Sequence, residues 1–150
     1  YLVESCGMTL DEVKDMLQTK SGLYGMSGGA GRDLRDVQAA AEAGNEDAEL
    51  ALRAYCYSIK KYIGSYAAAM GGLDAIVFGG GIGLGSALVR AWSLEGLEFL
   101  GVKLDGFKNR MAIAGMDLSM DDAPVRVFAV HTDEEIIVAR KAAALLTNAQ

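Results

Sequence analysis

The chain has 150 residues, of which 51% are hydrophobic, and a formal net charge of −6. This length and composition can bury one substantial core, so we expect one globular domain. Acidic and basic residues are interspersed without a basic face, which argues against nucleic acid as a partner, and no apolar run reaches the roughly 18 to 20 residues that span a bilayer. The N-terminus lacks the pattern of a signal peptide, so we predict a cytoplasmic protein that does not enter a membrane.

The cysteines and the histidine give no sign of a metal centre or a catalytic triad. Cys6 and Cys56 are far apart, without CxxC spacing or histidines around them, and are predicted to be reduced structural thiols. His131 is the single histidine of the chain and has no marked nucleophile beside it, so we interpret it as structural.

The first predicted helices are marked by capping residues. Thr9 followed by Glu12 forms a capping box that begins a short helix, and the Ser21-Gly22 pair can end it. Residues 27–31 form a glycine-rich loop that leads to Asp33, whose carboxylate can cap the next helix. We therefore expect a loop that passes directly into a helix N-terminus here.

The strongest periodic signal covers residues 45–70, where apolar side chains recur every three or four positions. The stripe consists of Ala48, Leu52, Tyr55, Ile59, Tyr62 or Ile63, Tyr66 and Met70. Asn45 supplies an N-cap, and Gly71 and Gly72 end the pattern. These features predict one long amphipathic helix whose stripe, tyrosines included, belongs to the core.

The next segment reads as strand, glycine turn and helix. Residues 73–78 are a short apolar and β-branched run typical of a strand. Residues 79–85 are rich in glycine and predict a turn, and residues 86–92 return to helical spacing.

The last third continues the alternation. Residues 111–114 and 125–130 are two further predicted strands, and Thr132 with Glu135 is expected to cap a final helix that ends near Leu146. Strands that alternate with helices predict an α/β fold.

The glycine run at residues 79–85 is the main candidate for ligand binding. Glycines between a strand and a helix let backbone N–H groups approach an anionic or polar ligand. No Lys-Ser or Lys-Thr follows as in a P-loop, and Ser86 stands where the dinucleotide fingerprint has its last glycine. The pattern therefore favours nucleotide binding and leaves a purely structural tight turn as an alternative.

Charged residues near two predicted helix starts have structural and functional interpretations. Asp33 and Arg35 can serve as a helix cap and a solvated charge. Asp133, Glu134 and Glu135 complement the dipole of the final helix. Because Mg²⁺ takes only one or two protein carboxylates besides phosphate oxygens and water, one carboxylate at the edge of a nucleotide site is chemically adequate.

Five segments together resemble one family over essentially the whole chain. They are residues 20–28 (KSGLYGMSG), 33–37 (DLRDV), 67–78 (AAAMGGLDAIVF), 80–83 (GGIG) and 132–135 (TDEE). In this order they resemble the C-terminal part of acetate kinase, a family of the actin, sugar-kinase and heat-shock-protein ATPase superfamily. The resemblance implies a ribonuclease-H-like, actin-type ATPase fold of the α/β class, with a mixed sheet flanked by helices.

The resemblance also sets the expected organisation. Residues 1–150 would be a single C-terminal nucleotide-binding domain portion of a larger two-domain kinase, and a start at Tyr1 without an initiator methionine agrees with a piece of a longer protein. The implied reaction is reversible transfer of the γ-phosphoryl group of ATP to acetate, which gives acetyl phosphate and ADP with Mg²⁺. The family also implies a homodimer.

Site residues follow from the resemblance position by position. Asp33, Leu34 and Arg35 would lie against the adenosine. The loop on its other side would contribute Gly81, Ile82, Gly83, Leu84 and Gly85. Glu134 matches the glutamate associated with Mg²⁺. The groups that bind the short-chain carboxylate and stabilise the transition state belong to earlier sequence, so we expect no catalytic residue here and an isolated chain without turnover.

The glycine turn departs from the family at two positions. The family usually has Glu-Asn where this chain has Leu84 and Gly85. An asparagine could hydrogen-bond the nucleotide, and its loss removes a contact worth about 0.5 to 1.5 kcal/mol. Backbone contacts from Gly81 and Ile82 need no side chain and can persist.

Two other classes of function remain open. The altered turn could mark a non-catalytic assembly or nucleotide-sensing module with the same fold. The incomplete glycine fingerprint, with Asp105 or Glu98 as a ribose contact, could belong to half of a dinucleotide-binding oxidoreductase. The sequence does not distinguish acetate, propionate and butyrate as acceptors, because the family builds the acyl pocket from residues outside this chain.

Overall fold

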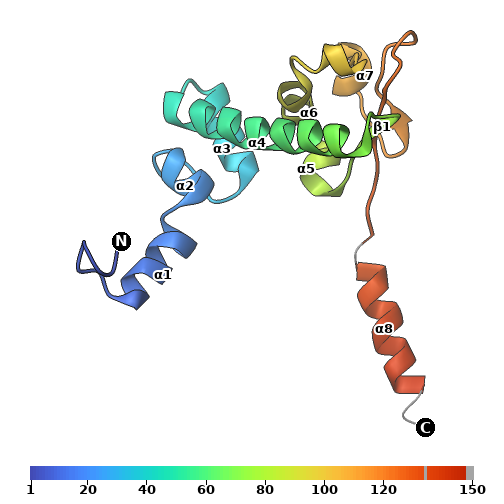
Figure 1. Ribbon diagram of the computed structural model, residues 1–150. Helices are drawn as coiled ribbons and strands as arrows, with labels where there is room; N and C mark the ends of the chain where they lie inside the picture. The colour runs from blue at the N-terminus through green and yellow to red at the C-terminus, as the bar shows by residue number, and fades with distance from the viewer. Residues whose placement is uncertain (134, 148–150) are drawn as a thin grey trace. The chain divides into compact units, whose positions relative to one another are not determined.

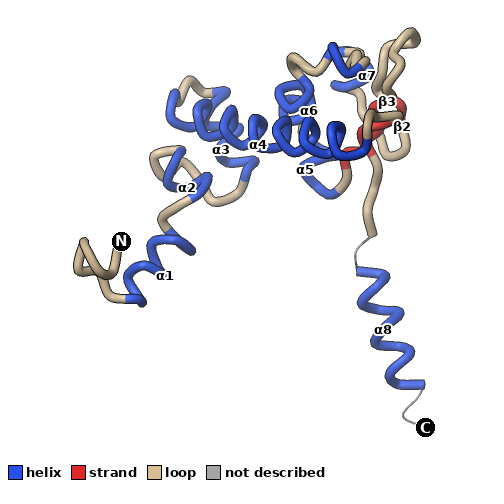
Figure 2. The backbone as a smooth tube through the Cα atoms, viewed as in Figure 1, coloured by secondary structure: helices blue, strands red, loops and turns tan. Residues whose placement is uncertain are grey.

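The computed structural model describes residues 1–133 and 135–147, most of them in helices (Figures 1 and 2). The chain divides into two compact units, Tyr1–Gly71 and Gly72–Gln150. The assignment of all 150 residues to one nucleotide-binding domain portion stays a prediction.

The first unit is helical, and its helices begin at the predicted caps. It contains α1 (Leu10–Thr19), α2 (Gly22–Met26), α3 (Leu34–Glu42) and α4 (Glu46–Met70). Thr9 and Glu12 form the expected capping box, and the Asp33 carboxylate accepts a hydrogen bond from the Arg35 N–H. Asn45 caps α4 by accepting from the Ala48 N–H, at 3.0 Å. These caps satisfy N–H groups that a helix cannot pair internally.

The core of the first unit lies where α3 meets the N-terminal half of α4. Leu34 and Val37 of α3 are buried there, as are Leu52 and Cys56 of α4. Alanine at positions 48 and 51 of α4 is fully buried as well. Small side chains at these positions allow the two helix backbones to approach closely.

The prediction that the whole stripe of α4 is core is wrong for its C-terminal half. Tyr62, Tyr66 and Met70 are 65%, 61% and 66% exposed. The nine-residue α3 is much shorter than the 25-residue α4, and the buried residues of α4 lie in its first half, apart from Ala67. Periodicity identifies an apolar face but does not say how far a neighbouring element covers it.

The second unit combines short helices with a small sheet. Its elements are β1 (Ala75–Phe78), α5 (Gly80–Gly85), α6 (Ala87–Leu94), the 3₁₀ helix η1 (Glu98–Leu100), α7 (Gly106–Arg110), β2 (Met116–Asp117), β3 (Arg126–Ala129) and α8 (Glu135–Thr147). The strand order is β1-β3-β2, with β1 parallel and β2 antiparallel to β3. The predicted α/β class with a mixed sheet is confirmed.

The register of the sheet places the site-bearing segments side by side. Phe78, the last residue of β1, pairs with Ala129 of β3, and the Val130 N–H donates to the Phe78 carbonyl at 2.8 Å. Because β1 and β3 are parallel, the segments that follow them leave the sheet at the same end. The glycine segment after β1 and residues 131–133 after β3 consequently start next to each other.

The predicted strand at residues 111–114 is wrong. The Asp105 carboxylate accepts hydrogen bonds from the Phe107 and Lys108 N–H groups and so starts α7, which ends with Met111 as its C-cap. Met111 and Ile113 are 60% and 68% exposed, and the strand begins only at Met116. Four apolar residues in a row were not a buried strand because a local cap directed the preceding chain into a helix.

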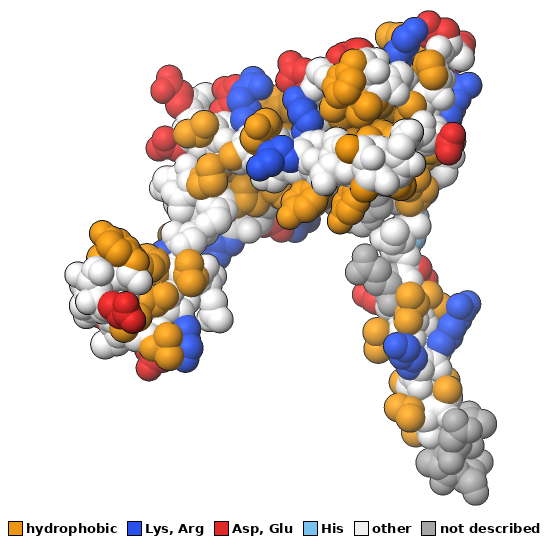
Figure 3. All heavy atoms as spheres, in the orientation of Figure 1, with side chains coloured by type: hydrophobic (Ala, Val, Ile, Leu, Met, Phe, Trp, Pro, Cys, Tyr) orange, Lys and Arg blue, Asp and Glu red, His pale blue; other side chains and the backbone are white. Residues whose placement is uncertain are grey.

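The final helix α8 is apolar at many exposed positions. Ile137, Val138 and Leu145 are 56%, 68% and 74% exposed, and Figure 3 shows hydrophobic side chains beside basic ones on this helix. Among the residues that the structure describes, no helix combines the length and the apolar character needed to cross a bilayer.

Candidate functional site

The predicted glycine turn is a short helix, α5, rather than an irregular loop. Four of its six residues are glycine. Each glycine in a helix costs about 1 kcal/mol relative to alanine, and an isolated helix of this length does not persist in water. Contacts from elsewhere in the unit must therefore hold α5 in its conformation.

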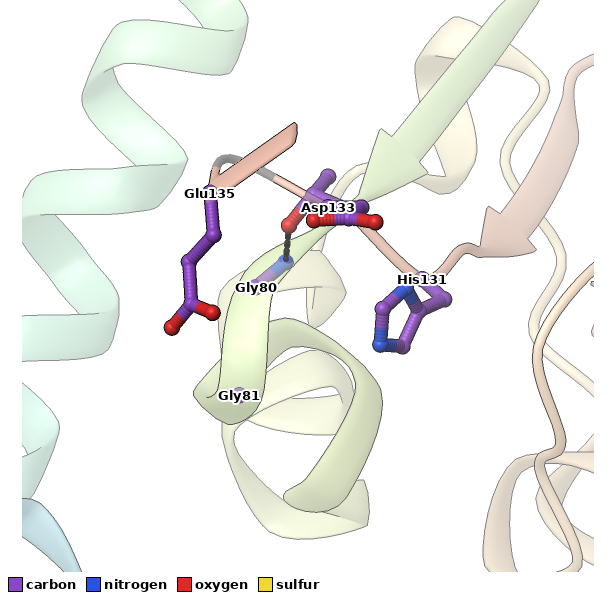
Figure 4. Close-up of a pocket in the computed structure, with 6 residues that line it drawn as sticks. Gly80, Gly81, His131, Asp133 and Glu135 are labelled. Carbon is purple, nitrogen blue, oxygen red and sulfur yellow. Dashed lines mark hydrogen bonds between the residues drawn. The ribbon is translucent and has the colours of Figure 1, made fainter. Parts of the chain in front are cut away.

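At its N-terminal end, α5 is held by Thr132. The Gly80 N–H donates to the Thr132 hydroxyl oxygen at 3.1 Å, which is the dashed line in Figure 4. A Cβ on Gly79 would come within 2.9 Å of the Thr132 methyl group, so glycine at position 79 permits the close approach. Gly80 has a φ of +72°, in the left-handed region that favours glycine.

This use of Thr132 corrects the expected cap of the final helix. Among the described residues α8 begins at Glu135, so Thr132 lies too far before it to be its N-cap, and the Thr132 hydroxyl oxygen accepts from the Gly80 N–H instead. The Asp133 carboxylate instead accepts a hydrogen bond from the Ile136 N–H, at 3.1 Å. The sheet register places Thr132 beside the end of β1, within reach of the Gly80 N–H.

At its C-terminal end, α5 is held by Arg90 of α6. The Arg90 side chain is buried, and its NH1 donates to the carbonyl oxygens of Gly83 and Leu84, each at 2.7 Å. Its Nε and NH2 donate to the side-chain and backbone oxygens of Asn109, also at 2.7 Å. The Asn109 amide in turn donates to the Ala87 carbonyl. Burial lowers the pKa of Arg90, yet a guanidinium stays protonated in proteins.

The glycines of this segment fall into two groups. A Cβ on Gly83 would lie 3.0 Å from the backbone carbon of Phe78, so position 83 must be small for α5 to pack on β1. A Cβ on Gly81 or Gly85 would meet no atom within 4 Å. Packing therefore explains Gly83, whereas Gly81 and Gly85 leave the backbone open to solvent or to a ligand.

A hollow of about 450 Å³ opens beside the start of α5. It is lined by Gly80, Gly81, His131, Thr132, Asp133 and Glu135. Figure 4 shows the side chains of His131, Asp133 and Glu135 arranged around the glycine backbone. The lining thus combines backbone amides with carboxylates, a hydroxyl and an imidazole, which suits a polar ligand or a hydrated cation.

Asp33 and Arg35 lie in the first unit and pair with each other. The Arg35 Nε and NH2 donate to the two carboxylate oxygens of Asp33, at 3.0 and 2.7 Å. These bonds and the Arg35 backbone N–H lower the pKa of Asp33 to about 2. The Arg35 side chain is 88% exposed, and Leu34 between them is buried in the α3 and α4 core.

The predicted site residues are thus distributed over both units. Within the second unit, Gly81 shares the hollow with the segment around Thr132 and Asp133. Asp33, Leu34 and Arg35 stand at the start of α3 in the first unit. Glu134, the predicted metal ligand, lies outside the described residues. Within residues 1–133 and 135–147, no three His, Cys, Asp or Glu side chains gather as a metal cluster.

Sequence reasoning missed Arg90 and Asn109. Arg90 is the single charged residue of α6, whose sequence is ALVRAWSL. A lone arginine within an apolar helix is a signal of a buried, hydrogen-bonded cation. Its acceptors were not predictable, because backbone carbonyls of Gly83 and Asn109 carry no sequence signature.

Comparisons with known proteins agree over most of the chain. The model of the Acetokinase family matches residues 1–140. The acetate kinase of Geobacillus kaustophilus is 49% identical over 140 residues, which are 93% of this chain and 35% of that protein. The acetate kinase of Methanosarcina thermophila is 44% identical over 141 residues, which are 94% of this chain and 34% of that protein.

Solved structures agree in the backbone as well. The crystal structure of Porphyromonas gingivalis acetate kinase superposes with a TM-score of 0.84 at 38% identity, covering 97% of this chain and 36% of that one. A propionate kinase from Francisella tularensis gives a TM-score of 0.81 at 30% identity, covering 93% and 35%. The chain therefore spans about a third of the length of the relatives it matches.

Proposed function

Because the chain belongs to the Acetokinase family, we propose that it forms the C-terminal ADP- and ATP-binding part of an acetate kinase. The reaction is reversible transfer of the ATP γ-phosphoryl group to acetate, which gives acetyl phosphate. The short-chain carboxylate and the catalytic groups bind outside these 150 residues, so the isolated chain has no turnover. Phosphoryl transfer depends mainly on positioning and on charge stabilisation, which can be shared between two domains.

The observation that carries this proposal is the open backbone of α5 beside a polar hollow. Gly80 and Gly81 line the hollow, and Gly81 and Gly85 have free space where a side chain would stand. Backbone groups that are fixed and uncovered can contact a nucleotide without any side chain. Ile82, which is 39% exposed between them, offers an apolar surface to an adenine or ribose.

Asp33, Leu34 and Arg35 are proposed as the second nucleotide-contacting segment. The guanidinium of Arg35 is held by Asp33 through two hydrogen bonds and is largely exposed. It is therefore oriented without being buried, which leaves one planar face free to stack on a base. The buried Leu34 anchors this turn to the core of its unit.

Mg²⁺ fits the donor set at the hollow. Asp133 and Glu135 both line it, and Mg²⁺ binds through one or two carboxylates together with substrate phosphates and water. We propose Glu134 as the protein ligand, with Asp133 and Glu135 adding negative charge around the cation. When bound, the metal would neutralise charge on the phosphates.

Nuclear magnetic resonance tests the nucleotide site directly. Titration of the chain with Mg-ADP should shift the amide signals of Gly80, Gly81 and Thr132 in a saturable manner. The same sample should show no acetate-dependent consumption of ATP in a coupled assay. Saturable shifts confined to helices without a predicted contact, or turnover by the isolated chain, would contradict the proposal.

We also propose that the chain self-associates, as the family resemblance implies. Tyr62, Tyr66 and Met70 are exposed along one line of α4, at i, i+4 and i+8, and an apolar strip of this kind is typical of an interface. Sedimentation equilibrium should show a dimer that dissociates when Tyr62 and Tyr66 are both replaced by serine. Tyr57→Ser is the matched control, since Tyr57 is equally exposed but lies off this line. A monomeric wild-type chain would exclude this association.

A further inference from the structure

Among the described residues of the second unit, Arg90 is the most deeply buried charged side chain, and it links three elements. It reaches from α6 to the carbonyl oxygens of Gly83 and Leu84 in α5 and to both oxygens of Asn109 in α7. Its residue exposure is only 1%. The Asn109 amide closes the arrangement by donating to the Ala87 carbonyl at the start of α6.

The partners of Arg90 are unusual because all of them are neutral. Among the described residues, Arg90 forms no salt bridge with a carboxylate; its acceptors are three backbone carbonyls and one amide oxygen. A buried cation without an opposite charge carries a desolvation cost, and its removal alone leaves the carbonyl and amide oxygens around it without their donor. What an apolar side chain cannot provide is the fixed, forked geometry of the donors.

The guanidinium of Arg90 holds α5, which is the segment proposed to contact the ligand. The carbonyl groups of Gly83 and Leu84 lie at the C-terminal end of α5, where the positive charge of Arg90 complements the helix dipole. Because α5 contains four glycines, its own sequence does not specify its conformation. Thr132 holds one end through the Gly80 N–H, and Arg90 holds the other.

We propose that Arg90 is a positioning residue for nucleotide binding: it fixes the glycine helix α5 through the carbonyls of Gly83 and Leu84, so that the open backbone at Gly81 and Gly85 is preformed. The inference rests on the proposed nucleotide site. Arg90 itself lies beneath that surface and does not touch the ligand.

The experiment combines hydrogen exchange with calorimetry on the full 150-residue chain. Arg90→Lys keeps the positive charge but places its N–H donors on a single nitrogen. That nitrogen cannot reach the carbonyl oxygens of α5 and the oxygens of Asn109 together. Arg90→Gln removes the charge and guards against a misfolded lysine variant. Arg126→Lys is the matched control, because Arg126 also donates to a backbone carbonyl, that of Met120, away from α5.

The expected result is selective loosening of α5. Without nucleotide, amides of residues 82–86 should exchange about tenfold faster in both Arg90 variants, while amides of α4 stay unchanged. Mg-ADP should bind about tenfold more weakly to both variants and unchanged to Arg126→Lys.

Other outcomes separate this proposal from the proposed function. Exchange that is unchanged in α5, or faster throughout the chain, would overturn the positioning role, as would selective loosening with unchanged Mg-ADP affinity. A wild-type chain that binds no Mg-ADP contradicts the nucleotide site itself; hydrogen exchange of α5 then still decides whether Arg90 fixes the helix.

Discussion

The helices α4 and α5 show two different ways of specifying a helix. The 25-residue α4 has a side-chain N-cap from Asn45, a left-handed Gly71 at its end and an apolar periodicity, all visible in the sequence. The six-residue α5 is mostly glycine and is held by Thr132 at one end and Arg90 at the other. Local signals specify the scaffold helix, whereas tertiary hydrogen bonds specify the helix that exposes its backbone.

The proposed function explains why α5 is built differently from α4. Side chains that favour a helix also cover its backbone, so a segment that must offer its backbone to a ligand gives up that stability. The second unit compensates with the bonds that α5 receives from Arg90 of α6, which Asn109 of α7 supports, and from Thr132 after β3. Replacing those contacts should therefore affect α5 far more than any single cap affects α4.

The largest effect is expected for Arg90→Met. Methionine leaves the Gly83, Leu84 and Asn109 oxygens without their buried donor, which should lower the free energy of unfolding by about 3 kcal/mol. Urea denaturation measures the change. The control Arg126→Met removes a half-exposed guanidinium and should cost less than about 1 kcal/mol. Equal losses in the two variants would contradict the special role of Arg90.

A pair of glycine substitutions should separate packing from ligand access. Gly83→Ala places a Cβ 3.0 Å from the Phe78 backbone and should destabilise the chain by about 1 to 3 kcal/mol. Gly81→Ala meets no atom within 4 Å and should stabilise it slightly, by about 0.5 to 1 kcal/mol, because alanine favours a helix. Thermal unfolding gives both values. A stabilising Gly83→Ala would mean that α5 is free to move from β1.

Loss of a local cap should cost less. Asn45→Ala removes the acceptor for the Ala48 N–H and should lower stability by about 1 kcal/mol. Because the rest of α4 keeps its packing, circular dichroism of the native state should stay unchanged while the urea midpoint falls. A loss as large as that of Arg90→Met would contradict the contrast between the two helices.

The smallest effect concerns the pH dependence of the Asp33 and Arg35 pair. The pKa of Asp33 is lowered from 3.8 to about 2 in the folded chain, so its stabilising contribution is present above pH 3.8 and is lost as the pH falls towards 2. The pair is exposed, so the contribution is small. A carboxyl titration followed by nuclear magnetic resonance should give a midpoint near 2, and Arg35→Gln should move it back towards 3.8. An unchanged midpoint in Arg35→Gln would contradict the assigned cause.

The sequence was most informative where the signals are local. The capping box at Thr9, the caps at Asp33 and Asn45, and the strand that ends at Phe78 were predictable, and the strand predicted at 125–130 is β3, which is one residue shorter at each end. These features depend on residues within one turn or one strand. The α/β class followed from the alternation of such elements, and the mixed sheet followed from the family resemblance.

The wrong predictions concern features that depend on residues far away in the sequence. The exposed Tyr62 and Tyr66 of α4 depend on how far α3 extends, and the segment at 111–114 depends on the cap at Asp105. In the site, the glycine run and the Thr-Asp-Glu-Glu segment were found, but the bond between Gly80 and Thr132 spans 52 positions. No pattern of spacing predicts a contact that the sheet register creates.

Calorimetry with Mg-ADP tests the central claim, that the open glycine backbone of α5 contacts a nucleotide. The account predicts saturable binding to the wild-type chain. Gly85→Asn, which has free space for its side chain, should tighten that binding by up to about tenfold through one added hydrogen bond. Absence of binding at millimolar Mg-ADP in both proteins would contradict the account.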